Sequence, residues 1–357
     1  MSAVELKVNE PLNEAYEYTY IWIDGDGGLR NKTQVSQNGK LDKLSWWTYD
    51  GSSTKQAEGY RSDIRLKPVA LFPDPFQERG YLVLCETYVY DHDNDIVVPH
   101  ETNARHSCLA TMERVKDEVP MFGVEQEYIL YDREGKPFEW KNCDNPGLGG
   151  QGPYYCGVGG DRAFGREIAM EHKDMCLAAG VKICGTNAEV MASQWEYQIG
   201  ICTGIEMGDH MVMARYIMDR VTENYSAKAD LDPKPKKGDW NGSGCHTNFS
   251  TKVMREDGGL GKILEARDKL SQNHSVHMEV YGEKNRERMS GQHETSNYDK
   301  FSKGVYDGIG DRSASIRIPL HVYQDKKGYL EDRRPGSNAC IYKVTERIMK
   351  TVCLNEE

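Results

Sequence analysis

The chain has 357 residues, and its 45 Lys and Arg residues against 56 Asp and Glu residues give a formal net charge of −11 at pH 7. An acidic chain without a basic run longer than Lys236–Lys237 is a poor general binder of nucleic acid, so we expect no nucleic-acid partner. No unbroken apolar run is longer than that of Tyr81–Cys85, which is far below the about 20 residues of a membrane span. The polar N-terminus lacks the basic start and apolar core of a secretory signal.

The N-terminal part of the chain predicts a small β-rich domain over residues 18–100, preceded by an arm over residues 1–17. Strands are expected over Tyr18–Asp24, Thr33–Ser36 and Tyr81–Tyr90. The segment Leu44–Asp63 is rich in Gly, Ser and Asp, which favours an exposed functional loop. The acidic stretch Asp91–Asp95 marks the edge of this domain.

From residue 101 to residue 357 the pattern changes to helices alternating with strands, which predicts a second, larger domain. A strand is expected over Phe122–Tyr131. Helices are expected from Thr102 to Val119, from Asp161 to Gly180, along the apolar stripe from Met207 to Val221, over Leu260–Ser271 and over Ile341–Val352.

Ten cysteines are spread along the chain without a CxxC pair or a Cys/His zinc spacing. Without an export signal, such cysteines are expected to be reduced thiols, most of them buried. The sequence therefore favours a cytoplasmic protein with no membrane partner.

Two acids interrupt the predicted strand Phe122–Tyr131. Glu125 and Glu127 are two residues apart, and since a strand alternates its faces, both point the same way. Like charges on one face of an apolar strand are unfavourable unless a cation lies between them. The alternative is a solvated strand face, which a single pair of this kind does not exclude.

A second pair of acids lies in the segment Asn187–Glu196. If the chain turns back at Ala192–Ser193, Glu189 and Glu196 become directly opposed partners in a hairpin. A helix would also align these two positions, but the β-branched and aromatic neighbours favour strands. Two such pairs make a metal site the better interpretation.

One histidine completes the candidate metal site. His246 begins a short strand after a glycine-rich approach, although a solitary histidine is more often a structural residue. Several carboxylates with at most one imidazole favour Mg²⁺ or Mn²⁺ over zinc.

Arginines follow late in the chain, and Arg317 lies within a strand pattern. Arginines beside a divalent-metal site indicate binding of phosphate or carboxylate anions, and together these features point to phosphoryl transfer. Neither a P-loop nor the protein-kinase motifs are present.

Nine ordered motifs covering nearly the whole chain from about residue 18 resemble glutamine synthetases of the eukaryotic type. These are YDGSS from Tyr49, PHETNARHSC from Pro99, FGVEQEYIL from Phe122, GQGPYYCGVGGDRAFGR from Gly150, GTNAEVMASQWEYQIG from Gly185, NGSGCHTNFST from Asn241, GQHETS from Gly291, SASIRIP from Ser313 and GYLEDRRP from Gly328.

The resemblance implies ATP-dependent ligation of ammonia to the side-chain carboxylate of L-glutamate through γ-glutamyl phosphate. It also implies an α+β fold, in which a small N-terminal β-grasp domain precedes a larger α+β catalytic domain. The family forms two stacked pentameric rings with active sites between subunits. The alternatives left open are a related ligase that uses another amine or acid, and a catalytically silent ring-forming scaffold.

The family pattern also implies a role for individual residues. Two or three Mg²⁺ or Mn²⁺ ions per active site would be held by Glu127, Glu189 and Glu196 and by Glu125, His246 and Glu331. Glutamate and the transferred phosphoryl group would be bound by Asn241, Gly242, His246, Arg288, Arg312 and Arg333. ATP would contact Glu125, Asn248, Ser250, Arg317 and Tyr329. The ammonium pocket would be formed by Asp50, Ser53 and Glu294, with Asp50 taking the proton and Glu294 shielding the acyl phosphate from water.

The sequence departs from the family pattern at a few places. Ala192 and Ile201 stand where proline is usual, and Gln292 replaces a common aromatic residue. The stretch from Tyr306 to Asp311 is longer than usual and directly precedes Arg312.

Overall fold

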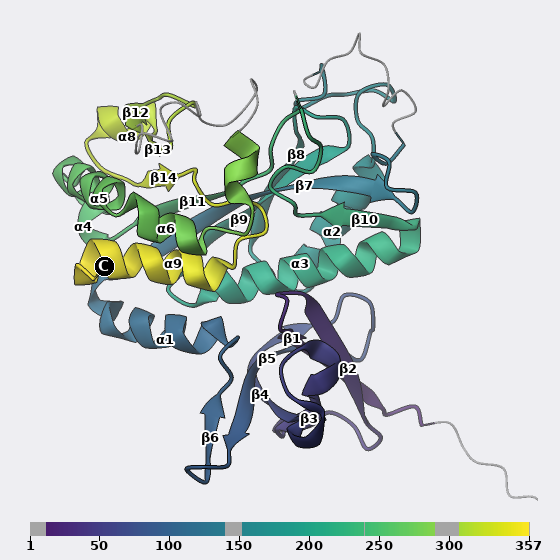
Figure 1. Cartoon of the computed structure of the whole chain (residues 1–357). Coiled ribbons are helices and arrows are strands. Elements are labelled where there is room, and N and C mark those ends of the chain that lie inside the picture. Colours follow the sequence, from purple (N-terminus) through teal and green to yellow (C-terminus); the bar gives the residue numbers. More distant parts are fainter. Residues whose placement is uncertain (1–11, 140–151, 239, 290–306, 357) are drawn as a thin grey trace, which may run out of the picture. The chain divides into compact units, whose positions relative to one another are not determined.

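The structure is a computed structural model that describes residues 12–139, 152–238, 240–289 and 307–356 (Figure 1). The chain divides into two compact units, a small unit of residues 1–102 and a large unit of residues 103–357. None of the helices in the described ranges combines the length and apolar content that crossing a membrane requires.

The small unit is built around one sheet. In the part of the chain that the structure describes, its strands are β1 (Tyr16–Ile23), β2 (Leu29–Ser36), β3 (Trp47–Asp50), β4 (Asp63–Pro73), β5 (Gly80–Asp91) and β6 (Ile96–Pro99). They are arranged in the order β2-β1-β5-β4-β3, with β6 paired to β5. Strand β1 is antiparallel to β2 and parallel to β5. The three strands predicted in this part of the sequence are thus confirmed.

The prediction of one long loop over Leu44–Asp63 was wrong in part. The segment contains β3, whose Tyr49 is buried and donates a hydrogen bond to Gln56 Oε1 at 2.6 Å, and two short 3₁₀ turns, Gly51–Thr54 and Gly59–Arg61. Strand β4 was not predicted, although Ile64 and Leu66 alternate with exposed residues. Pro68 argues against a strand in the sequence, because proline cannot donate a backbone hydrogen bond. In the structure, the register of β4 with β5 shifts between Pro68 and Ala70, and this irregularity accommodates the proline.

The large unit contains a second, larger sheet. Its described strands are β7 (Met121–Asp132), β8 (Ile183–Ala188), β9 (Gln194–Thr203), β10 (Ala227–Asp230), β11 (Cys245–Ser250), β12 (Asp307–Ile309), β13 (Ile316–Ile318) and β14 (Leu330–Asp332). The order is β12-β13-β14-β11-β7-β9-β8, with β10 paired to β7. The strand predicted over Phe122–Tyr131 is β7, at the centre of this sheet.

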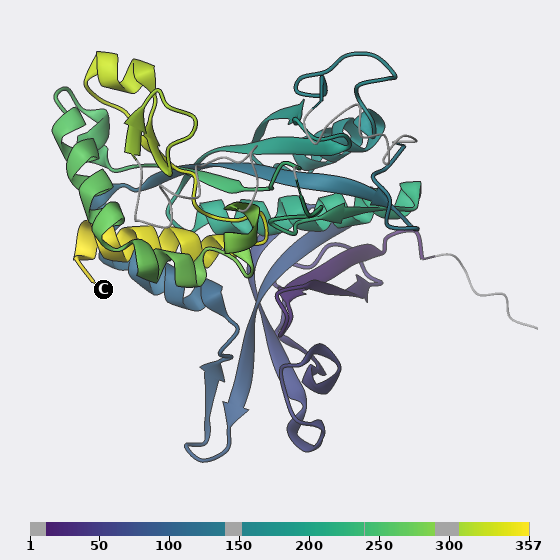
Figure 2. The ribbon, with the colours of Figure 1, turned by 45° about the horizontal axis from the view of Figure 1, so that its top comes forward.

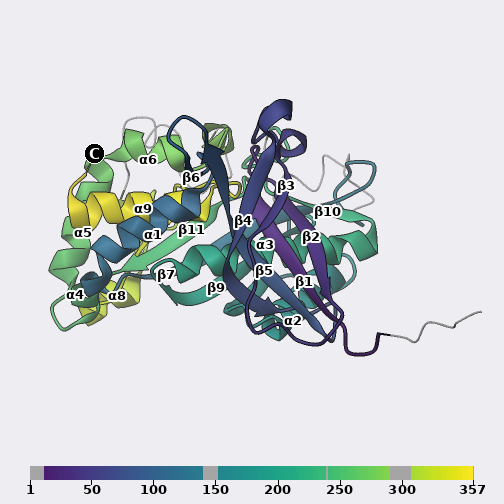
Figure 3. The ribbon, with the colours of Figure 1, turned by 90° about the horizontal axis from the view of Figure 1, so that it is seen from below.

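Helices pack against the sheet of the large unit. The described helices are α1 (Ala104–Arg114), α2 (Arg166–Ala178), α3 (Glu206–Tyr225), α4 (Lys252–Arg255), α5 (Leu260–Gln272), α6 (His274–Val280), α8 (Leu320–Asp325) and α9 (Ile341–Met349), with 3₁₀ turns at Lys116–Glu118 and Asn285–Met289 and a π turn at Lys350–Leu354. Helices α3 and α9 lie along one face of the sheet (Figures 1 and 2), and α1 lies beside α9 (Figure 3). The stripe predicted from Met207 to Val221 is buried on α3.

Two predicted helices begin later than expected. Helix α1 is capped by Asn103 rather than Thr102 and ends at Arg114. A separate 3₁₀ turn follows it, and this turn ends at Val119, which takes a left-handed backbone conformation. Helix α2 begins at Arg166 rather than near Asp161, since Gly165 has a left-handed φ of +75°. A Cβ atom at Gly165 would also lie 2.5 Å from Leu130 Cδ1, so the position requires glycine.

Contacts of β7 show which face of the sheet the helices cover. Gln126 accepts a hydrogen bond at 2.6 Å from Arg215 of α3, so its side chain points toward the helical layer. Because side chains alternate along a strand, Glu125 and Glu127 point to the opposite face. That face carries the candidate site.

Candidate metal centre and active site

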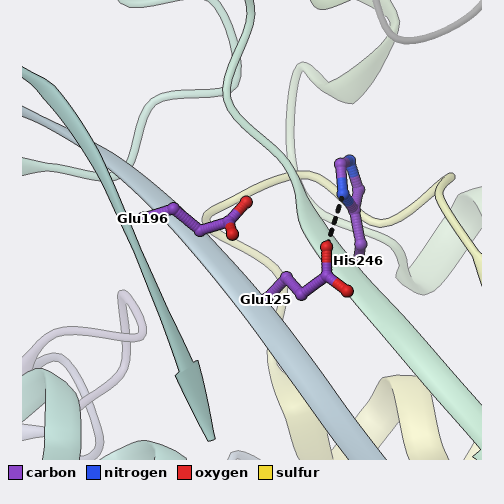
Figure 4. Close-up of side chains that lie close together, drawn as sticks. All are labelled: Glu125, Glu196 and His246. Atoms are coloured by element: carbon purple, nitrogen blue, oxygen red, sulfur yellow. Dashed lines mark ion pairs between the residues drawn. The ribbon is translucent and has the colours of Figure 1, made fainter. Parts of the chain in front are cut away.

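Acidic side chains from neighbouring strands meet on the face of the large sheet that points away from α3. Strand pairing places Glu127 directly opposite Glu196 of β9 and Glu125 directly opposite His246 of β11. Figure 4 shows Glu125, Glu196 and His246 pointing toward one another from β7, β9 and β11. The prediction that Glu125 and Glu127 share a face is confirmed, and His246 is the second residue of the short strand β11, which begins one residue earlier than predicted, at Cys245.

The predicted register of the second pair was wrong by two residues. Glu196 pairs with Asn187 of β8, and Glu189 lies just beyond the end of β8, where its N–H donates to Gln194 O at 2.8 Å. The turn that follows includes Ser193, which has a left-handed φ of 61°. A shift of two residues leaves Glu189 on the same face, so it still reaches the acidic cluster.

Two groups of potential metal ligands result, and they share one residue. Glu125, Glu196 and His246 form one group, and Glu127, Glu189 and Glu196 form the other. In each group one ligand atom per residue lies within 4.8 Å of the others. Glu196 belongs to both, so the two groups are adjacent.

The donors around the second group are neutral. Gly244 N–H donates to Glu127 Oε2 at 2.7 Å, Asn187 Nδ2 donates to Glu189 Oε1 at 3.1 Å, and Gln198 Nε2 donates to Glu196 Oε1. Within the described ranges, no Lys or Arg forms an ion pair with these three carboxylates, all of which are buried. Buried carboxylates without a basic partner stay ionised at neutral pH only beside a cation, so the residues present fit a divalent metal ion.

The burial of these glutamates, without a basic partner, also shifts their pKa values. Burial raises the pKa of Glu189 to about 6, and burial with the charge of the neighbouring glutamates raises the pKa of Glu127 and Glu196 above the usual range. Burial acts on Glu125 in the same direction, but the adjacent His246 imidazole, a hydrogen bond from Asn248 and the charge of Arg333 lower the pKa of Glu125 overall. A bound cation would reverse the upward shifts, because it favours the charged carboxylates.

His246 is placed as a ligand would be. Its Nδ1 atom lies 3.7 Å from Glu125 Oε2, and its buried Nε2 atom has no hydrogen-bond partner in the part of the chain that the structure describes. A Cβ atom at Gly244 would lie 2.7 Å from that Nε2 atom. The glycine therefore keeps the approach to the imidazole open.

An arginine-rich area adjoins the carboxylates at β13 and β14. Strand pairing places Glu331 opposite Asn248 and Arg317. The carboxylate of Glu331 accepts hydrogen bonds from Arg317 Nη1 at 2.9 Å and from Arg333 Nη1 at 2.6 Å, and Glu331 Oε1 lies 3.7 Å from His246 Nδ1. Glu331 thus lies beside the metal groups, but its charge is balanced by two arginines.

The residues expected to bind glutamate lie together. Arg288 Nη2 donates to the carbonyl oxygens of Arg333 and Arg334 at 2.7 and 2.6 Å. A Cβ atom at Gly242 would lie 2.8 Å from Arg288 Cβ, so only glycine permits this approach. The Gln194 amide, which the sequence analysis missed, accepts from Asn241 Nδ2 at 3.1 Å and donates to Gly242 O at 3.0 Å.

The residues expected around ATP are spread more widely. Asn248 Nδ2 donates to Glu125 Oε1 at 3.0 Å, so Asn248 borders the metal groups. Burial and the charges of Glu331 and Glu125 raise the pKa of Tyr329, so this phenol interacts electrostatically with two carboxylates of the candidate site. Ser250 Oγ instead accepts a hydrogen bond at 2.9 Å from Arg255.

The remaining predicted residues lie elsewhere or outside the described ranges. Glu294 and Gln292 are outside the described residues. Arg312 is exposed, and it follows β12, which the longer stretch before it forms by pairing in parallel with β13.

Asp50 and Ser53 belong to the small unit, where Asp50 ends β3 and caps the turn Gly51–Thr54. The Asp50 carboxylate accepts from Ser52 Oγ at 2.7 Å and from Ser53 Oγ at 2.9 Å. Hydrogen bonds from Ser52 and Ser53 lower the pKa of Asp50 to about 2. The carboxylate is therefore ionised throughout the neutral range.

Comparisons with known proteins identify the family. Glutamine synthetase of Rattus norvegicus is 51% identical over 99% of this chain and 94% of that protein, and glutamine synthetase of Homo sapiens is 52% identical over 97% and 92%. The fungal enzyme of Hebeloma cylindrosporum is 49% identical over 97% and 95%. The chain belongs to the glutamine synthetase family.

Two further findings agree with this assignment. The family model of the glutamine synthetase catalytic domain matches residues 102–276. A solved structure titled "Apo GmaS without ligand" matches 94% of this chain and 77% of that chain with a TM-score of 0.69 at 17% identity, which shows a shared fold. The resemblance drawn from the nine sequence motifs is confirmed, together with the α+β fold and the ligase class.

Proposed function

We infer that this glutamine synthetase joins ammonia to the side-chain carboxylate of L-glutamate, forming L-glutamine, ADP and phosphate through γ-glutamyl phosphate. The observation that carries the inference is the two groups of potential metal ligands that share Glu196, with the arginines around Glu331 beside them. Two anions, the terminal phosphate of ATP and the glutamate carboxylate, must approach each other in this reaction. Metal and arginine charge in one place makes that approach possible.

The proposed metal ligands are Glu127, Glu189 and Glu196 for one ion and Glu125, His246 and Glu331 for another, with two or three Mg²⁺ or Mn²⁺ ions per site. When bound, the ions would supply electrostatic stabilisation of the transferring phosphoryl group. The carboxylate and imidazole donors suit hard divalent cations. Glu331 would coordinate the second ion while its carboxylate accepts hydrogen bonds from Arg317 and Arg333.

The proposed substrate contacts follow from the same arrangement. Arg288, packed on Gly242, would bind the α-carboxylate of glutamate with help from Asn241. Arg333, with Arg312, would stabilise the phosphoryl group. The nucleotide would lie among Glu125, Asn248, Ser250, Arg317 and Tyr329.

The ammonium pocket would be formed by Asp50 and Ser53 of a neighbouring subunit together with Glu294. The low pKa of Asp50, to about 2, keeps the carboxylate negative so that it attracts ammonium. Ammonium has no lone pair, so it must lose a proton, which Asp50 would take, before ammonia bonds to the acyl carbon and phosphate leaves. We propose a cytoplasmic enzyme of two stacked pentameric rings, in line with the family pattern.

The test is phosphate release from ATP by the purified protein with L-glutamate, ammonium and Mg²⁺ or Mn²⁺. Release that requires all four components, with formation of glutamine, is the expected result. A folded oligomer that releases no phosphate would indicate a silent scaffold. Release with methylamine or a polyamine in preference to ammonium, or with another amino acid in preference to glutamate, would indicate a related ligase.

A further inference from the structure

Two neutral amides connect two of the three carboxylates of the second metal group. Gln198 Nε2 donates to Glu196 Oε1 and, at 2.9 Å, to Asn187 Oδ1. Asn187 Nδ2 in turn donates to Glu189 Oε1 at 3.1 Å. A continuous chain of hydrogen bonds therefore runs from Glu196 through Gln198 and Asn187 to Glu189, which we term the amide bridge.

The pairing of β8 with β9 builds the amide bridge. Asn187 lies directly opposite Glu196, and Gly185 lies directly opposite Gln198. A Cβ atom at Gly185 would lie 2.2 Å from Gln198 Oε1, so the glycine provides the space that the Gln198 amide occupies. The bridge is thus specified by three positions that touch no proposed substrate.

The chemistry of the bridge suits a metal site. Glu189 and Glu196 repel each other, and each carboxylate would turn toward solvent if nothing held it. The amides fix one oxygen of each carboxylate while adding no positive charge, so the group still attracts a cation. Glu331 shows the contrast, because Arg317 and Arg333 hold its oxygens and also neutralise it.

We propose that Asn187 and Gln198 are positioning residues that orient Glu189 and Glu196 for the divalent ion. The proposal rests on the metal site of the proposed function and extends it to two residues of the motif from Gly185 that were given no role. Residues that hydrogen-bond metal ligands commonly account for about 10- to 100-fold in metal affinity.

The experiment measures binding of Mn²⁺ alone to the full-length protein, from the electron paramagnetic resonance signal of free Mn²⁺. Gln198→Met removes the amide at nearly constant side-chain length, and Asn187→Ala removes the second amide. Gln34→Met, the same change in β2 of the small unit, is the matched control. We expect the Kd to rise about 10-fold in each bridge variant, equivalent to about 1.4 kcal/mol, and to stay unchanged in the control.

A double variant and a glycine variant separate positioning from a general loss of stability. Since the two amides act as one chain, Asn187→Ala with Gln198→Met should weaken binding about as much as either change alone. Gly185→Ala keeps both amides but displaces Gln198, so it should raise the Kd as well. In EDTA, the thermal midpoints of the bridge variants should match that of the wild type within the scatter of the control. The rise in midpoint that Mn²⁺ causes should be smaller in the bridge variants than in the wild type.

The outcomes distinguish this proposal from the one on which it rests. A wild-type protein that binds no Mn²⁺ would overturn the proposed metal site itself. Wild-type binding with equal affinity in the bridge variants would overturn only the positioning role. Two further results would contradict the positioning role. One is a loss of Mn²⁺ affinity in the double variant that equals the sum of the two single losses. The other is a fall in the thermal midpoint in EDTA that exceeds the scatter of the control.

Discussion

At the scale of single residues, Asp50 combines a structural and a chemical role that one substitution can separate. Its carboxylate caps the turn Gly51–Thr54 and is held by the hydroxyls of Ser52 and Ser53. Asparagine caps such turns about equally well, so Asp50→Asn should leave the small unit folded. The change removes the negative charge and the proton acceptor alone.

We therefore expect Asp50→Asn to slow glutamine formation by about 100-fold or more at neutral pH, as removal of a general base usually does. Formation of γ-glutamyl phosphate from ATP and glutamate should persist, since Asp50 is not proposed to contact either. Since hydrogen bonds lower the pKa of Asp50 to about 2, the wild-type carboxylate does not titrate near neutral pH. The deficit should shrink as the pH rises and free ammonia replaces ammonium.

The measurement is the pH profile of glutamine formation beside acyl-phosphate trapping by hydroxylamine. Ser52→Ala serves as the control, because it removes one hydrogen bond to Asp50 but keeps the carboxylate. Loss of ATP binding in Asp50→Asn, or a deficit that is constant across pH, would contradict the assigned role.

At the scale of elements, the pairing of β8, β9 and β7 forces three buried acids together, which makes the metal-free sheet sensitive to pH. Burial raises the pKa of Glu189 to about 6, and burial with neighbouring charge raises the pKa of Glu127 to about 7. A carboxyl group whose pKa is higher in the folded state stabilises the fold below its unfolded pKa. That stability is lost as the pH rises through the folded pKa.

The metal-free protein should therefore lose stability as the pH rises from about 4.5 to about 9, the pKa to which burial and neighbouring carboxylates raise Glu196, by about 1.4 kcal/mol for each unit of pKa shift. Thermal unfolding in EDTA measures this loss, and saturating Mg²⁺ should remove most of it. Glu196→Gln, which deletes the charge that both groups share, should flatten the dependence in EDTA and weaken Mg²⁺ binding. A stability that is independent of pH in EDTA would show that the acids are neutralised by other means.

Neighbouring side chains of strand β14 have different roles, because successive residues of a strand point to opposite faces. Glu331 faces the candidate site, whereas Asp332 points into the protein and pairs with Arg334 at 2.8 and 2.7 Å, both side chains being fully buried. Tyr281 also donates to Asp332 at 2.7 Å. Removing one partner of such a pair leaves an unbalanced buried charge.

Asp332→Ala should thus lower the free energy of unfolding by about 3–5 kcal/mol, measured by denaturant unfolding. Asp257→Asn, at an exposed ion pair with Lys327, is the control and should cause no measurable change. Equal unfolding curves for Asp332→Ala and the wild type would mean that the buried pair contributes nothing to stability.

The elements also show what one sequence can and cannot predict. Strand β7 and helix α3 were predictable because their periodicity is local, and so was the shared face of Glu125 and Glu127. The pairing of Glu127 with Glu196, and of Glu125 with His246, was not, because register between strands distant in sequence leaves no local signal. The amide bridge depends on the same register and on the missing Cβ of Gly185.

At the scale of the whole molecule, the proposed function requires Asp50, a residue of the small unit, to act beside metal ligands that belong to the large unit. The proposed arrangement is that each active site takes Asp50 from one subunit and Glu127 from its neighbour. Head-to-tail interfaces of a ring supply such shared sites. A single inactivating change in each of two subunit types can test this arrangement.

Asp50→Asn and Glu127→Gln proteins should each be nearly inactive alone. If the sites are shared, randomly mixed rings should regain about a quarter of wild-type activity, because one interface in four pairs an intact Asp50 with an intact Glu127. The measurement is phosphate release after the two proteins are dissociated together and reassembled, with each protein reassembled alone as the control. If instead Asp50 served the metal site of its own chain, every site would carry one of the two defects, and mixing would restore nothing.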